Sequence, residues 1–289
     1  MASPLLVTGA TGNVGAPLVD ALVGAGVAVR AACRHPAGAT SPLVDPVRFD
    51  FTDPSTFDAA FAGVEVLFLV RPPVLTNARR DLFPALAHAA TLGLRHVVFL
   101  SVQGVDRLRF VPHARIEDWL RGSGLSWTFL RASFFDQNLI SVHGAAIRER
   151  AELLMPAGRG RTAFIDTHDI AAVAAQAMLE PARHLDRSWT LTGAEALTYG
   201  EVAGIMTAVL GRPIRYAQPG LLSYVLRARR ELRMSAGMIA TTSAIYTTAR
   251  LGLAAGLTDE VAQILHRPPT TMAQFVTRER MAFASSAEV

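Results

Sequence analysis

Lysine is absent from this chain of 289 residues, so all 28 of its basic residues are arginine. A phosphate-binding P-loop requires a lysine and is therefore excluded. The sequence contains a single cysteine, Cys33, which excludes an internal disulfide and any metal site built from paired cysteines. Arginine also accounts for the calculated pI of about 9.9, because the net charge is only +4.

Long apolar runs are missing as well, and no stretch approaches the roughly 20 residues that a membrane-spanning helix needs. The first residues lead directly into an apolar strand, so we expect a cytoplasmic protein without a membrane partner. Apart from one cluster, at Arg227, Arg229, Arg230 and Arg233, the arginines are scattered, and we expect no nucleic-acid partner. We expect a monomer or a homodimer. No Gly-x-Ser-x-Gly elbow and no paired-histidine motif occurs, which argues against hydrolase and metalloenzyme functions and predicts no metal site.

The residues that are present favour an α/β protein, since 51% are hydrophobic and 18% are charged. In the first half, short apolar runs alternate with helical stretches, which is typical of βαβ units and of a doubly wound parallel sheet of the Rossmann type. The expected strands are Leu5–Thr8, Val27–Cys33, Val47–Phe51, Val64–Val70, His96–Ser101 and Ser126–Arg131. Later helices are expected over Asn138–Arg150, Thr167–Leu179, Tyr199–Leu210, Gly220–Leu253 and Thr258–Leu265.

A glycine-rich loop joins the first strand to the first helix. Glycine lets the backbone turn tightly and approach an anion, while the helix N-terminus offers unpaired N–H groups and a positive dipole end. A loop of this kind between a buried strand and a helix predicts the pyrophosphate site of a dinucleotide. The candidate cofactor-binding residues of the loop are Gly9, Thr11, Gly12, Asn13, Val14 and Gly15.

This loop sets the expected domain organisation. Residues 1–138 are predicted to form an NAD(P)-binding Rossmann domain, and residues 139–289 a smaller, mostly helical lobe that binds substrate. Strands near residues 164 and 190 are expected to join or flank the main sheet.

The end of the second strand indicates which dinucleotide is bound. An acidic residue about twenty positions after the loop would bind the ribose 2′-hydroxyl and favour NAD. This chain has Arg34 there, which can pair with a 2′-phosphate, so NADP(H) is favoured and NAD stays possible. Asp50 and Phe51 are candidates for the adenine end, although Asp50 could equally cap a helix.

Ligands of open α/β sheets bind at the carboxyl ends of the strands, which adds candidates after strands four and five. Val70-Arg71-Pro72 would flank the ribose and pyrophosphate. Ser101 and Gln103 could orient a substrate carbonyl or merely cap a loop. Arg131 is expected to pair with a structural carboxylate such as Asp166 rather than with substrate.

The segment after the sixth strand supplies the candidates for the substrate. Ser133 and Phe134 would line the nicotinamide. Phe134, Phe135 and Asn138 would bind a planar apolar molecule, because two adjacent aromatic rings can form a flat wall. Core packing explains the two rings equally well.

Together these segments resemble the NmrA-like branch of the atypical short-chain dehydrogenase/reductases. The resemblance spans about residues 5–280 and weakens after residue 215. Its motifs are Gly9–Gly15, Arg34, Asp50–Asp53, Gly124–Arg131, Phe134–Asn138, Phe164–Asp166, Asp169–Ala171 and Leu191–Gly193. The family includes NAD(P)H-dependent quinone and isoflavone-type reductases, tailoring enzymes of secondary metabolism, and redox-sensing regulators that bind the dinucleotide without turnover.

The wider superfamily uses a Tyr-x-x-x-Lys pair, which cannot exist in a chain without lysine. By similarity, the lysine position falls at His113 and the tyrosine position near Arg109. Histidine can bind a ribose hydroxyl or deliver a proton near neutral pH, so His113 is a candidate for cofactor binding and for catalysis, together with Ser101 and Gln103. The alternative is a structural histidine at the start of a helix.

The resemblance implies an NADP(H)-dependent oxidoreductase that acts on an apolar planar molecule, such as an aromatic, quinone or polyketide-like compound. A quinone can take its proton from solvent, which suits a site without the tyrosine–lysine pair. Two other functions stay open. One is an NAD(P)-sensing regulator without turnover, and the other is a tailoring enzyme of secondary metabolism with altered chemistry such as oxygenation.

Overall fold

The computed structural model describes residues 4–109 and 111–284, and its contacts divide the chain into two compact units. Unit 1 runs to Ala132 and also contains Thr167–Leu191 and Glu260–His266, while the remaining segments form unit 2. A single boundary after residue 138 therefore does not describe this division. Two later segments return to unit 1 because one supplies a strand of its sheet and both supply helices that cover it.

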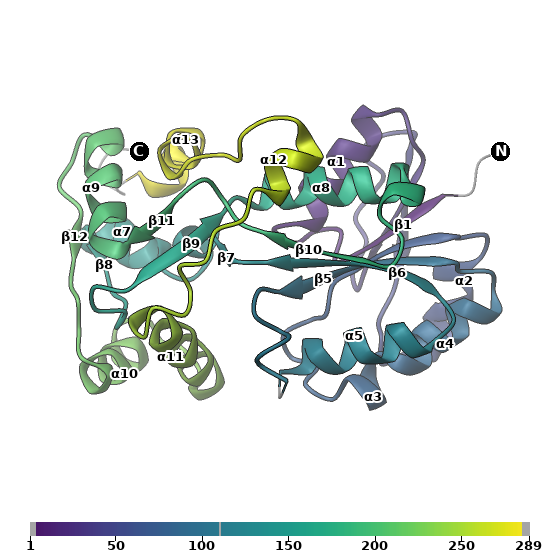
Figure 1. Ribbon diagram of the computed structural model, residues 1–289, viewed down its shortest axis with the longest axis horizontal. Helices are drawn as coiled ribbons and strands as arrows, with labels where there is room; N and C mark the ends of the chain where they lie inside the picture. The colour runs from purple at the N-terminus through teal and green to yellow at the C-terminus, as the bar shows by residue number, and fades with distance from the viewer. Residues whose placement is uncertain (1–3, 110, 285–289) are drawn as a thin grey trace. The chain divides into compact units, whose positions relative to one another are not determined.

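Unit 1 is built on a sheet of seven parallel strands in the order β10-β6-β5-β4-β1-β2-β3 (Figure 1). The strands are β1 (Leu5–Thr8), β2 (Val29–Cys33), β3 (Val44–Arg48), β4 (Val66–Leu69), β5 (His96–Val102), β6 (Ser126–Ala132) and β10 (Arg187–Leu191). The strand order reverses between β1 and β4, which is the topological switch point where such sheets bind ligands. The predicted Rossmann-type fold is confirmed.

Helices cover both faces of this sheet, so most side chains of its central strands are buried. Figure 1 shows α1 and α8 on one face and α4 and α5 on the other. The first face carries α1 (Gly15–Gly24), α8 (Thr167–Leu179) and α12 (Glu260–Leu265), with a 3-10 turn, η2, at Pro181–Arg183. The second carries α2 (Phe57–Phe61), α3 (Ala78–Asp81), α4 (Phe83–Thr91) and α5 (Pro112–Gly122), with a 3-10 turn, η1, at Pro54–Thr56.

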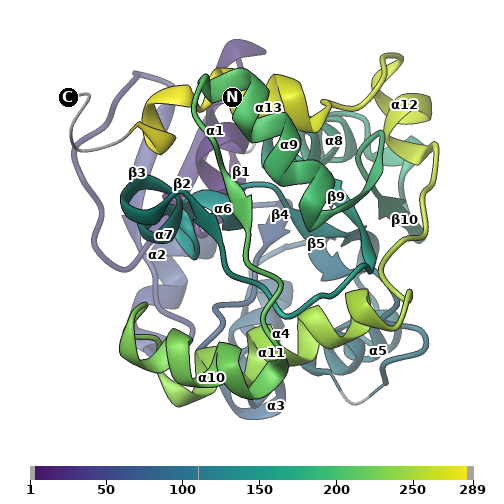
Figure 2. The ribbon, with the colours of Figure 1, turned by 90° about the vertical axis from the view of Figure 1, so that its left-hand side faces the viewer.

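Unit 2 combines two small sheets with helices around an aromatic core. Its sheets have the orders β11-β9-β7 and β12-β8. The ring of Tyr199 lies 5.5 Å from that of Phe164 and 5.8 Å from that of Tyr246, both edge-on. Helices α10 and α11 pack against each other (Figures 1 and 2). The elements are β7 (Phe134–Phe135), α6 (Asn138–Ser141), α7 (Gly144–Arg150), β8 (Glu152–Leu153), β9 (Arg161–Ile165), β11 (Ala196–Thr198), α9 (Tyr199–Leu210), β12 (Arg215–Tyr216), α10 (Leu221–Arg230), α11 (Ala236–Arg250), α13 (Met272–Arg278) and a 3-10 turn, η3 (Arg280–Phe283).

Several predicted elements were wrong in their bounds, and the helix predicted over Asn138–Arg150 is two helices, α6 and α7. The third strand ends at Arg48 rather than Phe51, and the side chain of Phe51 is buried beyond the end of the strand. Pro46 lies within β3, which is tolerated because β3 is the edge strand of the sheet. The single helix predicted over residues 220–253 is two helices, because Arg233 adopts a left-handed φ of 51° and the Ser235 side chain caps α11.

A buried carboxylate joins β5, β6 and α5. Glu117 is fully buried, and its Oε1 accepts a hydrogen bond from the Ser101 hydroxyl at 2.7 Å. Its Oε2 accepts from Nη2 of Arg131 at 2.7 Å and from Nη2 of Arg121 at 2.9 Å. Because a buried charge must be paired and hydrogen-bonded, these contacts fix the register between the helix and the two strands.

The partner predicted for Arg131 was therefore wrong. Its guanidinium pairs with Glu117 from the same unit, and Asp166 instead pairs with Arg278 of unit 2, at 2.6 Å. The sequence places Asp166 immediately after an apolar strand, but it does not indicate that this strand belongs to the smaller sheet.

Glu117→Gln tests the buried ion pair. Losing one partner of such a pair costs roughly 3–5 kcal/mol of the free energy of unfolding, and we expect a value near the lower limit. The reason is that the side chains of Arg131 and Arg121 are 17% and 36% exposed, so water can partly solvate the charges that lose their partner. Urea denaturation measures the change. The matched control is Asp118→Asn, which removes an exposed carboxylate next in sequence and should cost less than about 1 kcal/mol. Equal losses in the two variants would contradict the assignment.

Candidate functional site

The glycine loop between β1 and α1 brings backbone atoms closer together than side chains would allow. Gly9 has a φ of +63°, and its carbonyl accepts a hydrogen bond from the N–H of Gly12 at 2.9 Å. A Cβ on Gly15 would lie 2.1 Å from the Gly9 carbonyl oxygen, so only glycine fits there. Thr11, Gly12 and Asn13 are exposed, which leaves this part of the loop open to a ligand.

The start of α1 also favours an anion. Val14 occupies the N-cap position and offers no side-chain acceptor to the first N–H groups of the helix. Those N–H groups and the positive end of the helix dipole stabilise negative charge at this point. The loop residues therefore fit the pyrophosphate of a dinucleotide.

The ends of β1 and β4, on either side of the switch point, are joined by one hydroxyl. The Thr8 Oγ1 donates to the carbonyl of Phe68 at 2.9 Å and accepts from the N–H of Val70 at 3.0 Å. Val70 is thereby held at the carboxyl edge of the sheet. The side chain of Val70 also lies 3.6 Å from the position that a Cβ on Gly9 would occupy.

Arg71, the next residue, is half-buried in the loop after β4. Its Nη1 donates to the carbonyls of Pro72 at 3.0 Å and Leu75 at 2.9 Å. Its Nε is buried and has no partner among the described residues, and burial lowers the pKa of this guanidinium. A buried N–H without an acceptor is costly, so a ligand oxygen at this position would be stabilising.

Arg34 is exposed and directly follows β2. Asp50 is close enough that the charge of Arg34 helps to lower its pKa, after the larger effects of the Thr52 N–H and hydroxyl. Both Thr52 groups donate to Oδ1 of Asp50, at 2.8 and 2.7 Å. Asp50 therefore stabilises a turn, while the helix-capping carboxylate is Asp53. Phe51 is buried.

Ser101 lies near the end of β5 and Gln103 directly follows the strand, in different environments. The Ser101 side chain is buried, and its hydroxyl proton is engaged with Glu117. Gln103 is half-buried, and its backbone N–H donates to the carbonyl of Ala132 at 2.9 Å, which joins the ends of β5 and β6.

His113 lies in the first turn of α5 with its ring stacked on Phe99, at a centroid distance of 5.9 Å. Burial lowers its pKa to about 4, and the positive charge of Arg71 contributes in the same direction. The imidazole is therefore neutral at neutral pH and can bind a hydroxyl, but the imidazolium is too scarce to be the main proton donor. Arg109, near which the superfamily tyrosine was expected, forms a surface ion pair with Asp118.

The residues predicted to line the nicotinamide and the substrate belong to unit 2. Phe134 and Phe135 form β7, which pairs with β9. The Phe134 ring lies 5.6 Å from that of Phe164, so it is partly a core residue. Asn138 is half-buried at the start of α6. The Oγ of Ser133 is buried and has no partner in the described part of the chain.

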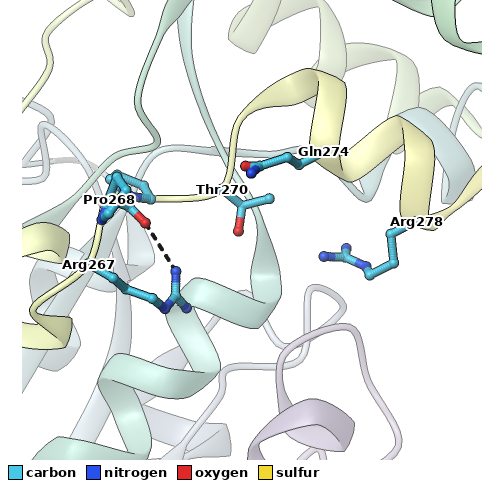
Figure 3. A pocket seen from close by; sticks show the side chains of 6 residues that line it. Arg267, Pro268, Thr270, Gln274 and Arg278 are labelled. Carbon is cyan, nitrogen blue, oxygen red and sulfur yellow. Dashed lines mark hydrogen bonds between the residues drawn. The ribbon is translucent and has the colours of Figure 1, made fainter.

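A pocket of about 400 Å³ in unit 2 was not predicted (Figure 3). In Figure 3 the side chains of Thr270 and Gln274 point into the space between Arg267 and Arg278, and Arg267 donates to the carbonyl of Pro268 at 3.2 Å. The only relevant sequence signal is the Arg-Pro-Pro run, which indicates a break between helices. The pocket is lined by Arg267, Pro268, Pro269, Thr270, Gln274 and Arg278.

Comparison with known proteins connects this site to a family. The model of the NmrA-like family matches residues 1–247. An NAD(P)H azoreductase of Xenophilus azovorans is 33% identical over 98% of this chain and all of its own length.

Solved structures show the same fold. An NADPH-dependent quinone oxidoreductase from Escherichia coli, complexed with NADPH, has a TM-score of 0.83 at 23% identity and covers 95% of this chain and 99% of its own. The negative transcriptional regulator NmrA, in complex with NADP, has a TM-score of 0.74 at 17% identity and covers 96% of this chain and 95% of its own.

His113→Ala separates the two roles proposed for this residue. Because its pKa is about 4, the ring stays neutral from pH 6 to 8. The reaction rates of the parent and of the variant should therefore depend on pH in the same way over that range. Calorimetric titration should instead show dinucleotide binding weakened by about 0.5–1.5 kcal/mol, the value of one hydrogen bond. His113→Asn, whose amide can also bond a hydroxyl, should recover part of this loss.

The lowered pKa of His113 also predicts how the stability of the folded protein changes with pH. Because the folded pKa lies below the ordinary value of 6.5, the unfolded chain takes up the proton first as the pH falls. The contribution of His113 to the stability is present above pH 6.5 and is lost as the pH falls to about 4. His113→Asn should therefore show a smaller loss of stability than the parent across that interval. A rate that falls through a pKa near 7 only in the parent would restore the role of proton donor.

Proposed function

The chain belongs to the NmrA-like family, and we propose that it is an NADP(H)-dependent reductase of apolar planar small molecules. The observation that carries the proposal is the 33% identity with an NAD(P)H azoreductase over 98% of the chain. Azo compounds and quinones are both flat, conjugated acceptors of a hydride. The proposed substrate class therefore comprises aromatic, quinone and polyketide-like compounds. We place the protein in the cytoplasm as a monomer or a homodimer.

In this proposal unit 1 holds the dinucleotide along the carboxyl edge of its sheet. The loop from Gly9 to Gly15 binds the pyrophosphate, and Arg34 pairs with the 2′-phosphate of NADP(H). The open glycine loop and the exposed guanidinium support these two roles. Asp50 and Phe51 would border the adenine. The turn at Asp50 uses only Oδ1, so Oδ2 would be able to accept a hydrogen bond from the adenine amine.

Arg71 and His113 would contact the ribose side of the cofactor. The buried Nε of Arg71 needs an acceptor that the described residues do not supply, and a ribose or phosphate oxygen would provide it. Neutral His113 can donate or accept one hydrogen bond with a ribose hydroxyl. Val70, Pro72, Ser101 and Gln103 would complete this edge, with Ser101 acting through its bond to Glu117.

The dinucleotide supplies a hydride when it is bound, and the protein supplies orientation and exclusion of water. Reduction of a quinone to a hydroquinone takes one hydride and one proton. With His113 neutral, we propose that the proton comes from solvent. Phe134, Phe135 and Asn138 of unit 2 are our candidates for binding the planar ring, and Ser133 and Phe134 for contact with the nicotinamide.

A second candidate function is sensing of the dinucleotide redox state without turnover. The specific observation in its favour is that the Ser101 hydroxyl is engaged with Glu117, so a residue that could polarise a carbonyl is occupied. A tailoring enzyme that uses the bound dinucleotide for different chemistry, such as oxygenation, would share the same site.

Turnover distinguishes the reductase from the sensor. Mixing the protein with NADPH and a naphthoquinone or an azo dye should deplete the absorbance of the reduced nicotinamide and yield one reduced quinone for each NADPH consumed. A sensor would bind both redox forms and deplete nothing. Tight binding of NADPH without depletion across a panel of quinones, azo dyes and polycyclic ketones would refute the reductase function.

Arg34→Asp tests the choice of cofactor. A charge-assisted hydrogen bond is worth about 1.5–3 kcal/mol, so the parent should bind NADPH roughly one to two decades more tightly than NADH, and the variant should lose this preference. Calorimetric titration with both dinucleotides measures it. Arg95→Asp is the matched control, because Arg95 is also exposed but precedes β5, at the opposite edge of the sheet. Equal affinities of the parent for the two dinucleotides would return Arg34 to the role of a surface charge.

A further inference from the structure

Positive charge is concentrated in one stretch of unit 2. Residues 202–258 contain seven arginines and a single acidic residue, Glu231. The whole chain has a net charge of +4, so the rest of the sequence is slightly negative. Such an asymmetry indicates a surface that attracts anions.

The same stretch exposes large apolar side chains. Of the thirteen large hydrophobic residues that are exposed in the described part of the chain, eight lie between Leu221 and Leu257. Leu222 is 82% exposed and Leu226 is 56% exposed. They are followed along the chain by Met238 and Ile245 on α11 and by three leucines just after it. Exposed apolar groups that gather in one segment, rather than singly, mark an interaction surface.

The spacing on α10 places apolar and basic groups on one side of the helix. Tyr224 and Ala228 are buried and lie one turn apart, so they mark the inner face. Leu222 and Leu226 have the same spacing on the opposite face. Arg229 continues that face in the next turn, so the first half of the outer surface is apolar and the second half is basic.

The arginines at the end of α10 are available to a partner. Arg227 is paired with Glu152 and Glu231. For Arg229, Arg230 and Arg233, by contrast, no ion pair occurs within residues 4–109 and 111–284, and all three are exposed. Long arginine side chains can keep the guanidinium at a phosphate layer while their methylene groups contact apolar matter.

The neighbouring helix α11 adds an uncharged surface. Arg250 is the only charged residue among its fifteen. Ile239, Thr242, Tyr246 and Ala249 form its buried face, which leaves mainly glycine, alanine and threonine on the outside, with Met238 and Ile245 at the margin. Figures 1 and 2 both show α10 and α11 beside each other at the same end of unit 2.

We propose that the α10–α11 surface, defined as residues 221–257, docks on the face of a bilayer that contains anionic phospholipid. Leucines on the outer face of α10 would enter the boundary between headgroups and acyl chains, and Arg229, Arg230 and Arg233 would contact the lipid phosphates. A nucleic acid would use the arginines but not the projecting leucines. A second copy that presented the same face would bring two clusters of arginine together, which charge repulsion opposes.

Docking of this kind needs no membrane-spanning segment. In the described part of the chain no helix is both long enough and apolar enough to cross a bilayer. The expectation of no membrane partner was derived from the absence of a membrane-spanning segment. The exposed leucines and arginines instead lead us to propose peripheral binding. The inference is independent of whether the protein turns over NADPH.

Co-sedimentation with vesicles tests the proposal. The full chain should pellet with vesicles of three parts phosphatidylcholine to one part phosphatidylglycerol, and not with phosphatidylcholine alone. Raising the salt from about 0.1 M to about 0.5 M should weaken binding, because it screens the arginine–phosphate attraction. The variant Leu222→Glu/Leu226→Glu should bind about tenfold more weakly or worse, and Arg229→Gln/Arg230→Gln should lose most of the salt dependence.

The matched control adds the same two charges elsewhere. Leu185→Glu/Met281→Glu replaces two residues that are 39% and 78% exposed and lie outside the α10–α11 surface. This variant should pellet like the parent. Circular dichroism and NADPH titration verify that each variant folds, so a loss of vesicle binding alone assigns the surface. The proposal is overturned if the parent binds no anionic vesicles, or if the leucine variant binds them as well as the control does. A dimer of the parent in velocity sedimentation that the leucine variant abolishes, without vesicle binding by either protein, would assign the surface to a second copy instead.

Discussion

The hydrogen bonds around Glu117 constrain the part of the molecule on which the proposed chemistry depends. A carboxylate without solvent contact is stable only when its oxygens are fully engaged. Here Ser101 comes from β5, Arg131 comes from β6, and Arg121 comes from the same helix as Glu117. Helix α5 is therefore held at one angular setting over the two strands. His113 lies four residues earlier on that helix, so the setting of its ring follows from the same contacts.

Much of unit 1 could be predicted because its determinants are local. Strands β1, β4 and β5 are short, largely apolar runs, and the glycine spacing of the phosphate loop follows directly from a backbone contact that allows no Cβ. Burial and ion pairing were harder to predict. The sequence places Ser101 at the end of a strand, but only the folded chain shows that its hydroxyl is bonded to Glu117. The pKa of His113 likewise depends on its burial and on the charge of Arg71, which is distant in the sequence.

Unit 2 was predicted less well for the same physical reason. Its short strands pair over long sequence distances, as β11 does with β9, so no single segment carries an alternating pattern long enough to identify it. The break between α10 and α11 depends on one left-handed residue, Arg233, for which the sequence gives only a weak signal because arginine rarely adopts that conformation. The aromatic core gathers Phe164, Tyr199 and Tyr246 from three separate elements. The role of Phe134 as core or substrate wall therefore could not be decided from its neighbours in the sequence.

The absence of lysine finally limits how the site can handle protons. Arginine stays charged at any ordinary pH, so a buried arginine must be paired rather than titrated, as Arg131 is with Glu117 and Arg278 is with Asp166. Histidine is then the side chain best suited to exchange a proton near neutral pH. Burial lowers the pKa of His96 and of His113 to about 4 and that of His143 to about 3. None of these three histidines is mainly in its protonated form at neutral pH. The lack of a protonated histidine is the reason why an acceptor whose product can be protonated by water, such as a quinone, is the substrate that we propose.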